Sequence, residues 1–144
     1  LLKGSILGRR PVAFDLLETL LWTPAEGFVL LERHLARLEA SAAWFDRPLD
    51  STFVRGALEQ AVAGATRPLR LRLVVDVEGR ARVASQPHVP VPGPVRLKLA
   101  AAPVDSGLVW LHHKTTMRAV YEQARAGVGE CDDVLLWNER GEVC

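Results

Sequence analysis

Two polar patterns in the sequence could carry chemistry, and each lies at a predicted helix. Lys114 stands in "LHHKTTMRAV", directly before an amphipathic pattern. A lysine amine that is removed from water has a lowered pKa, and the neutral amine can attack a carbonyl carbon. The second pattern places His34, Arg37 and Ser41 at helical spacing beside an apolar stripe, where the arginine could bind an anion bidentately. By pattern alone, a solvated lysine and a solvated arginine are more frequent than functional ones.

Other common site chemistries find little support. The sequence has no glycine-rich phosphate loop of either common type and no GxSxG motif. His112 and His113 could ligate a metal ion, but adjacent side chains in a strand point apart and the acidic residues are remote, so we expect no metal site. We expect His34 to be a hydrogen-bonded structural histidine, and Thr115 and Thr116 to cap a helix that starts at the lysine.

The composition favours a soluble chain with one ordinary domain or two small pieces. The 144 residues are 49% hydrophobic, which is enough to bury a core. The net charge of +1 comes without a basic cluster, so we expect no nucleic-acid partner. No apolar run approaches the ~20 residues of a membrane span, so we expect no membrane partner. The two cysteines, Cys131 and Cys144, have no framework spacing, which favours a reduced, cytoplasmic setting.

Residues 11–104 are predicted to form an N-terminal α+β domain with two layers, an antiparallel sheet and two helices. "PVAFDLLETLLW" is typical of a buried strand, and "FVLLERHLARLEASAAWF" carries one helical apolar stripe. "PLDSTFVRGALEQAVAGAT" predicts a second helix, with Asp50 or Ser51 as N-cap and Gly64 as the stop. The alternation in "PLRLRLVVDVEGRARVASQ" predicts a hairpin with one solvated face.

The rest of the chain is predicted to begin a second domain. "PHVPVPGPV" holds four prolines in nine residues, which indicates a connector, and "VRLKLAAAPVD" resumes strand alternation. The lysine helix and a hairpin in "DDVLLWNERGEVC" then follow. Because a helix and a hairpin bury too little surface to be stable alone, we expect residues 105–144 to be the start of an incomplete domain.

Four segments together resemble the class IV pyridoxal-phosphate (PLP) enzymes: "FDLLETLLW", "GFVLLERHLARLEASAAWF", "HKTTMRAVYEQA" and "DDVLLWNERGEV". The resemblance runs from about Phe14 to Val143 in the family's order. It implies PLP as the cofactor, bound through its phosphate by Arg37 of the "HxxRL" motif and covalently by Lys114, which then serves as general base. It implies more weakly that Thr19 and Arg118 contact the substrate. It also implies that residues 105–144 begin the cofactor-binding domain of the class IV fold, and that the protein is a homodimer.

Within that family, aminodeoxychorismate lyase is the nearest resemblance. Transaminases usually carry a tyrosine five residues after the lysine, whereas this chain has Ala119 there, preceded by Arg118. The resemblance implies that 4-amino-4-deoxychorismate is converted to 4-aminobenzoate and pyruvate, a step of folate biosynthesis. In addition, "LLKGSIL" resembles the tail of an aminodeoxychorismate synthase subunit. We therefore expect residues 1–10 to be a leader or the tail of a preceding domain, and a fused or associated synthase component as partner.

Two alternatives stay open. One is a class IV transaminase for D-amino acids or branched-chain amino acids. The other is a non-catalytic domain that serves dimerisation or contact with the synthase component. In the family, a glutamate that pairs with the pyridine nitrogen of the cofactor follows the "GEV" strand, and it would come next after Cys144. Without that partner the pyridine ring is a poorer electron sink.

Overall fold

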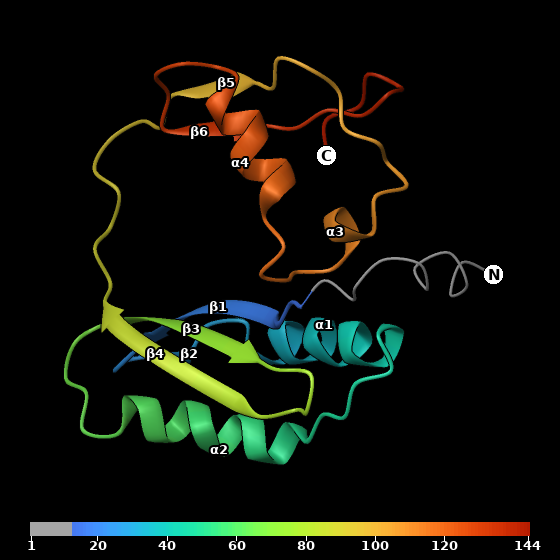
Figure 1. Cartoon of the computed structure of the whole chain (residues 1–144). Coiled ribbons are helices and arrows are strands. Elements are labelled where there is room, and N and C mark those ends of the chain that lie inside the picture. Colours follow the sequence, from blue (N-terminus) through green and yellow to red (C-terminus); the bar gives the residue numbers. More distant parts are fainter. Residues whose placement is uncertain (1–12) are drawn as a thin grey trace.

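Residues 13–144 of the computed structural model are described, and they form two sheets joined by a long connector (Figure 1). The larger sheet has the strand order β2-β1-β3-β4, and every neighbouring pair is antiparallel. Its register places Leu20 opposite Leu71 and Leu73 opposite Val83. The strands span β1 (Leu16–Thr23), β2 (Gly27–Phe28), β3 (Leu69–Val75) and β4 (Ala81–Pro87).

Helices α1 (Leu31–Trp44) and α2 (Ser51–Val62) pack on one face of this sheet. Alternate strand residues point to the same face, so the sheet offers the helices a continuous apolar layer. The predicted α+β fold with an antiparallel sheet and two helices is confirmed. The core consists of ten buried side chains: Leu16, Leu20, Leu35, Leu38, Ala42, Val54, Leu58, Leu71, Leu73 and Val75.

The helix and turn signals of this half are also confirmed. The Asp50 carboxylate accepts hydrogen bonds from the backbone N–H groups of Thr52 (2.9 Å) and Phe53 (3.1 Å), so Asp50 is the N-cap of α2. Gly64 follows α2 at φ 74°, in the left-handed region that glycine adopts without strain. In the β3–β4 turn, Gly79 has φ 79°, and a Cβ there would lie 2.5 Å from the Pro48 carbonyl oxygen.

The second sheet is small and parallel. Residues 88–96 contain no helix or strand, which confirms the connector. Strand β5 (Leu97–Leu99) then pairs with β6 (Asp133–Leu135). The predicted domain boundaries stay a prediction. Strand β5 precedes residue 104 in the sequence and belongs to the second sheet. The segment predicted as a leader, residues 1–10, lies outside the described residues.

The chain between β5 and β6 holds the one-turn helix α3 (Val109–His112) and helix α4 (Ala119–Ala126). After β6, the Asn138 N–H donates to the Glu142 carbonyl (2.9 Å), which closes a turn inside the segment "DDVLLWNERGEVC" that was predicted as a hairpin. None of the helices in residues 13–144 has the length and apolar character that crossing a membrane requires.

The segment around Lys114 pairs with the free edge of β1, beyond the point that β2 covers. The Leu17 N–H donates to the Lys114 carbonyl (3.0 Å), the Thr116 N–H donates to the Asp15 carbonyl (2.9 Å), and Leu16 forms a bridge with Thr115. These bonds attach the second half of the chain to the first sheet. They also fix the backbone of this segment in an extended conformation.

The prediction that Thr115 and Thr116 cap a helix starting at the lysine is wrong. Helix α4 begins only at Ala119, and its N-cap residue, Arg118, makes no side-chain capping bond. The Thr116 hydroxyl instead accepts a hydrogen bond from the Asp15 N–H (2.9 Å), and the Thr115 hydroxyl accepts one from the Met117 N–H (3.2 Å). Pairing with β1 is the physical reason, because a residue held in a strand cannot also begin a helix.

Candidate active site

Lys114 lies partly buried at the junction between β1 and the second half of the chain. Burial is the main cause that lowers the pKa of its amine. The nearby guanidinium groups of Arg37, Arg118 and Arg70 lower this pKa further, whereas the carboxylate of Glu18 acts in the opposite direction. The structure therefore brings Lys114 within electrostatic range of two predicted site residues, Arg37 and Arg118. A lowered pKa increases the fraction of neutral amine, the form that can act as nucleophile or base.

The pairing with β1 determines which side chains share a face. Residues that lie opposite each other in an antiparallel pair point to the same side, and neighbours along a strand alternate. Thr115 pairs with Leu16 and shares its buried face, so Lys114 shares the opposite face with Thr19. Thr19 lies opposite Arg72 of β3 in the register. This register places the Thr19 side chain on the same side of the sheet as Lys114. The predicted contact of Thr19 with the substrate stays a prediction.

Arg37 is held by a buried carboxylate, that of Glu18 in the middle of β1. The Arg37 Nε donates to Glu18 Oε1 (2.7 Å) and its Nη2 donates to Oε2 (2.6 Å), a bidentate pair. The hydrogen bonds that Glu18 accepts from Arg37 raise the pKa of Arg37. The Glu18 side chain is 1% exposed and that of Arg37 is 47% exposed. The pair therefore joins the interior of the sheet to the surface of α1.

His34 completes this cluster as the predicted structural histidine. His34 lies one helical turn before Arg37 on α1, and its Nδ1 is 2.8 Å from Glu18 Oε2. A proton on Nδ1 gives this nitrogen the donor role toward the carboxylate. Glu18 thus receives three hydrogen bonds from two residues of a single helix face, which satisfies a charge that would otherwise be costly to bury.

Ser41, the third member of the polar stripe, contacts the residue next to Lys114. Its hydroxyl lies 3.0 Å from Nδ1 of His113, and Ser41 is 3% exposed. The His113 ring stacks on Trp44, with 5.3 Å between ring centroids, and meets Phe45 edge-on at 5.0 Å. Burial lowers the pKa of His113, and the neighbouring His112 lowers it further. His113 thereby docks the lysine segment on the C-terminal half of α1.

His112 and His113 were expected to lie in one strand, and this expectation is wrong. His112 ends the one-turn helix α3, and only His113 is extended. They nevertheless contact different groups, because His112 Nε2 lies 2.8 Å from the Ser106 carbonyl oxygen. Within residues 13–144, no group of three or more His, Cys, Asp or Glu side chains is arranged to hold a metal ion.

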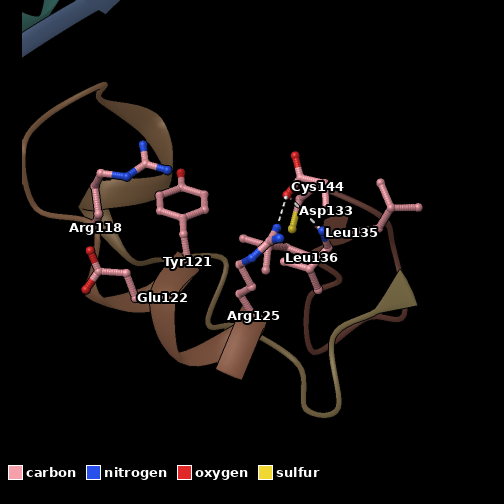
Figure 2. A pocket seen from close by; sticks show the side chains of 9 residues that line it. Arg118, Tyr121, Glu122, Arg125, Asp133, Leu135, Leu136 and Cys144 are labelled. Atoms are coloured by element: carbon pink, nitrogen blue, oxygen red, sulfur yellow. Dashed lines mark hydrogen bonds and ion pairs between the residues drawn. The ribbon is translucent and has the colours of Figure 1, made fainter. Parts of the chain in front are cut away.

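Arg118 lies at the start of α4 and lines a cavity of about 350 Å³ between α4 and β6 (Figure 2). Its guanidinium carbon lies 5.3 Å from the centroid of the Tyr121 ring. Further along α4, Arg125 donates to the carbonyls of Asp132 (2.7 Å) and Cys131 (3.0 Å), which attaches α4 to the start of β6. The predicted contact of Arg118 with substrate stays a prediction.

Sequence reasoning missed Glu18, the residue with the most hydrogen bonds in this cluster. The sequence did contain a signal, because a carboxylate in the middle of an otherwise apolar strand must have buried partners. Ser41 was recognised only as part of a polar stripe. Its partner could not be derived from the sequence, because His113 lies 72 residues away.

The chain belongs to the class IV aminotransferases, since the sequence model of that family, "Amino-transferase class IV", matches residues 15–144. It is similar in structure to a protein from Mesorhizobium loti that is provisionally described as an amino-acid aminotransferase. The two are 39% identical with a TM-score of 0.83, and the match covers 91% of this chain and 65% of that one. The chain thus spans less than two thirds of that protein's length. No curated protein matches the sequence significantly.

Two further structures define the range of the similarity. A hypothetical aminotransferase from Mycobacterium tuberculosis, with α-ketoglutarate and PMP bound, is 29% identical with a TM-score of 0.65, and the match covers 90% of this chain and 54% of that one. A protein from Legionella pneumophila, provisionally described as a 4-amino-4-deoxychorismate lyase, is 18% identical with a TM-score of 0.69, over 90% and 54% of the two chains. At that identity the likeness shows the fold alone.

Class IV aminotransferases depend on PLP, and the described residues fit that cofactor. A partly buried lysine with a lowered pKa suits the covalent bond to its aldehyde carbon. The guanidinium groups of Arg37, Arg70 and Arg118, all within electrostatic range of that lysine, suit the charge of a phosphate. These residues would hold PLP, which supplies an electron-withdrawing ring beside the substrate.

Proposed function

We propose that the intact protein is a PLP-dependent enzyme in which Lys114 binds the cofactor and moves a proton of the substrate. The observation that carries this proposal is the partial burial of Lys114 beside β1, which lowers the pKa of its amine, and the charges of Arg37, Arg118 and Arg70 lower this pKa further. Burial and cationic neighbours are the two means by which a lysine becomes a nucleophile near neutral pH. Membership of the class IV family supports the same role.

The other residues of the cluster would bind and orient. Arg37 has one edge of its guanidinium on Glu18, and the N–H groups of Nη1, which have no acceptor among the described residues, would bind the cofactor phosphate. Thr19 shares a face with Lys114, so its hydroxyl is a candidate for contacting the substrate. His113 and Ser41 would keep the lysine segment against α1.

For the reaction we propose a lyase that acts on 4-amino-4-deoxychorismate. Lys114 Nζ would take the proton from the ring carbon that bears nitrogen, and the C–O bond of the enolpyruvyl ether would break. The expelled enolate takes up a proton at carbon and leaves as pyruvate, while the ring becomes aromatic as 4-aminobenzoate. Ala119, where transaminases usually have a tyrosine, supports the lyase, and so does Arg118 before it. A fused or associated synthase component and a homodimer belong to this proposal.

A transaminase is the second candidate, and the comparisons supply the observation that favours it. The Mesorhizobium loti and Mycobacterium tuberculosis proteins, at 39% and 29% identity, are both described as aminotransferases. Their identities exceed the 26% and 18% of two proteins that are provisionally described as 4-amino-4-deoxychorismate lyases. In a transaminase, Lys114 would carry the proton between two carbon atoms rather than support the loss of pyruvate.

Covalent trapping tests the role of Lys114. The intact protein is incubated with PLP, reduced with borohydride and digested, and the modified peptide is located by mass spectrometry. We expect the label on Lys114, and its loss in Lys114→Ala. Lys98→Ala is the matched control, because that lysine donates to the Val128 carbonyl (2.9 Å) on the surface and should leave labelling unchanged. A label that persists in Lys114→Ala, or no PLP binding at all, would refute the proposal.

Product analysis then separates the two reactions. We expect the intact protein to release equal amounts of 4-aminobenzoate and pyruvate from 4-amino-4-deoxychorismate. A transaminase would instead convert bound PLP to PMP when given D-alanine or a branched-chain amino acid. PMP formation without 4-aminobenzoate would favour the second candidate. If PLP labels Lys114 but neither reaction is detected, the assignment of Lys114 as the cofactor lysine stands and both proposed reactions are refuted.

A further inference from the structure

We propose that Glu18 is a positioning residue, which holds Arg37 by one edge so that its opposite edge faces the cofactor phosphate. This inference rests on the proposed function, because it concerns the same site. It adds a residue for which neither the sequence motifs nor the comparisons give a role. Glu18 itself would not touch the cofactor and would act only through Arg37.

The geometry of the pair supports an oriented arginine. Both Nε and Nη2 of Arg37 are engaged by the two oxygens of Glu18, at 2.7 and 2.6 Å. A bidentate pair fixes the plane of the guanidinium, whereas a single bond would let it rotate. The two N–H groups of Nη1 lie on the far edge, and no residue of 13–144 accepts a hydrogen bond from them, which leaves them for another acceptor. The 47% exposure of the Arg37 side chain keeps that edge accessible.

The burial of Glu18 argues that its charge has a use beyond stability. Its neighbours on the same face of β1, Leu16 and Leu20, are 0% and 2% exposed, and Leu73 opposite is 1% exposed. An apolar residue would pack there without the desolvation penalty, and replacing buried ion pairs by apolar residues is often neutral or stabilising. A carboxylate inside this apolar layer, fixed further by His34, provides a rigid anchor at a place where packing alone would not require one.

Two effects of Glu18 on a phosphate have opposite signs, which makes the inference testable. Its negative charge repels an anion, so removing the charge alone should tighten phosphate binding. Because Glu18 already orders Arg37, phosphate binding does not have to pay the entropy cost of immobilising this long side chain. Removing the hydrogen bonds to Glu18 should therefore weaken phosphate binding. Freezing one such side chain costs about 0.5–1.5 kcal/mol, which corresponds to roughly 2-fold to 10-fold in affinity.

The test compares PLP with pyridoxal, which lacks the phosphate, in the intact protein. We expect Glu18→Gln to weaken PLP binding by roughly 2-fold to 10-fold and to leave pyridoxal binding within about 2-fold, because only PLP uses Arg37. Glu18→Asp keeps the charge and should restore part of the PLP affinity. Asp76→Asn is the matched control, since the Asp76 carboxylate is also mostly buried and paired with an arginine, Arg80 (2.8 Å), but lies in the β3–β4 turn.

Tighter PLP binding in Glu18→Gln, or equal weakening of PLP and pyridoxal, would overturn the inference. Both results differ from a failure of the proposed function, in which wild type would bind neither compound at Lys114. If Glu18→Gln does not fold, NMR of the wild type decides. We expect the Arg37 Nε–H signal to persist, protected and nearly unshifted, when inorganic phosphate or PLP is added. A large shift or loss of that signal would mean that Arg37 leaves Glu18, and the inference would fail.

Discussion

Ser41 of helix α1 and His113, the residue before Lys114, lie 3.0 Å apart, from hydroxyl oxygen to Nδ1. This bond joins the first helix to the segment that carries the candidate lysine, across 72 residues of chain. We expect Ser41→Ala to lower the free energy of unfolding by about 1–3 kcal/mol, because it leaves a partly buried imidazole nitrogen without its partner. Urea denaturation of the intact protein measures the loss.

The control for this change is Ser85→Ala on β4, where the serine is exposed. A surface substitution of this kind should change the stability by less than about 0.5 kcal/mol. Equal effects of the two variants would show that the contact between Ser41 and His113 contributes nothing specific.

The stability should fall on acidification because of His113. Burial lowers its pKa from the ordinary 6.5, so the unfolded chain takes up a proton at a higher pH than the folded protein does. Stability is therefore lost as the pH falls below about 6.5 and toward the folded pKa. We expect thermal unfolding between pH 7 and pH 5 to show a smaller drop in Tm for His113→Asn than for wild type. His88→Asn, at an exposed connector position, should follow the wild-type profile.

Lys114 should cost stability at neutral pH. Its pKa is lowered mainly by burial, so the folded state disfavours the protonated amine relative to the unfolded chain. We expect Lys114→Met to raise the Tm at pH 7 by up to about 4 °C. The advantage should shrink as the pH rises toward the unfolded value of 10.5, and it should vanish only well above that pH, where the amine is neutral in both states. A stability difference between Lys114→Met and wild type that does not change between pH 7 and pH 10 would contradict this.

The β3–β4 turn should tolerate no side chain at Gly79. A Cβ there would lie 2.5 Å from the Pro48 carbonyl oxygen, and the residue has φ 79°. Gly93 has a similar φ of 76° but open space around it, so it is the matched control. We expect Gly93→Ala to cost about 1–2 kcal/mol from backbone strain, and Gly79→Ala to cost at least about 1 kcal/mol more from the overlap. Equal losses in urea denaturation would mean that Pro48 moves away freely.

Much of the first sheet could be predicted because its signals are local. The helical stripe of α1, the Asp50 cap and the alternation of the hairpin each depend on residues close in sequence. The start of α4 could not be predicted in this way. The threonines after Lys114 have good capping chemistry, but pairing of that segment with β1, about 100 residues earlier, takes precedence over it.

The site itself was predicted only in part, for a related reason. Lys114 and Arg37 stand in recognisable patterns, whereas the residues that orient them meet only in the folded chain. Glu18 was visible as an acidic residue in an apolar strand, but its two partners on α1 follow from the crossing of the helix over β1. The contact of Ser41 with His113 depends likewise on where the second half of the chain docks.

The attachment of the lysine segment to β1 has a mechanical consequence. A proline-rich connector alone, residues 88–96, would let the two sheets swivel about a single covalent link. The hydrogen bonds at Leu17 and Thr116 give the two halves a second point of attachment, beside the candidate lysine. Separation of the two halves would therefore require the hydrogen bonds beside Lys114 to break. The position of the candidate lysine and the rigidity of the molecule thus depend on the same contacts.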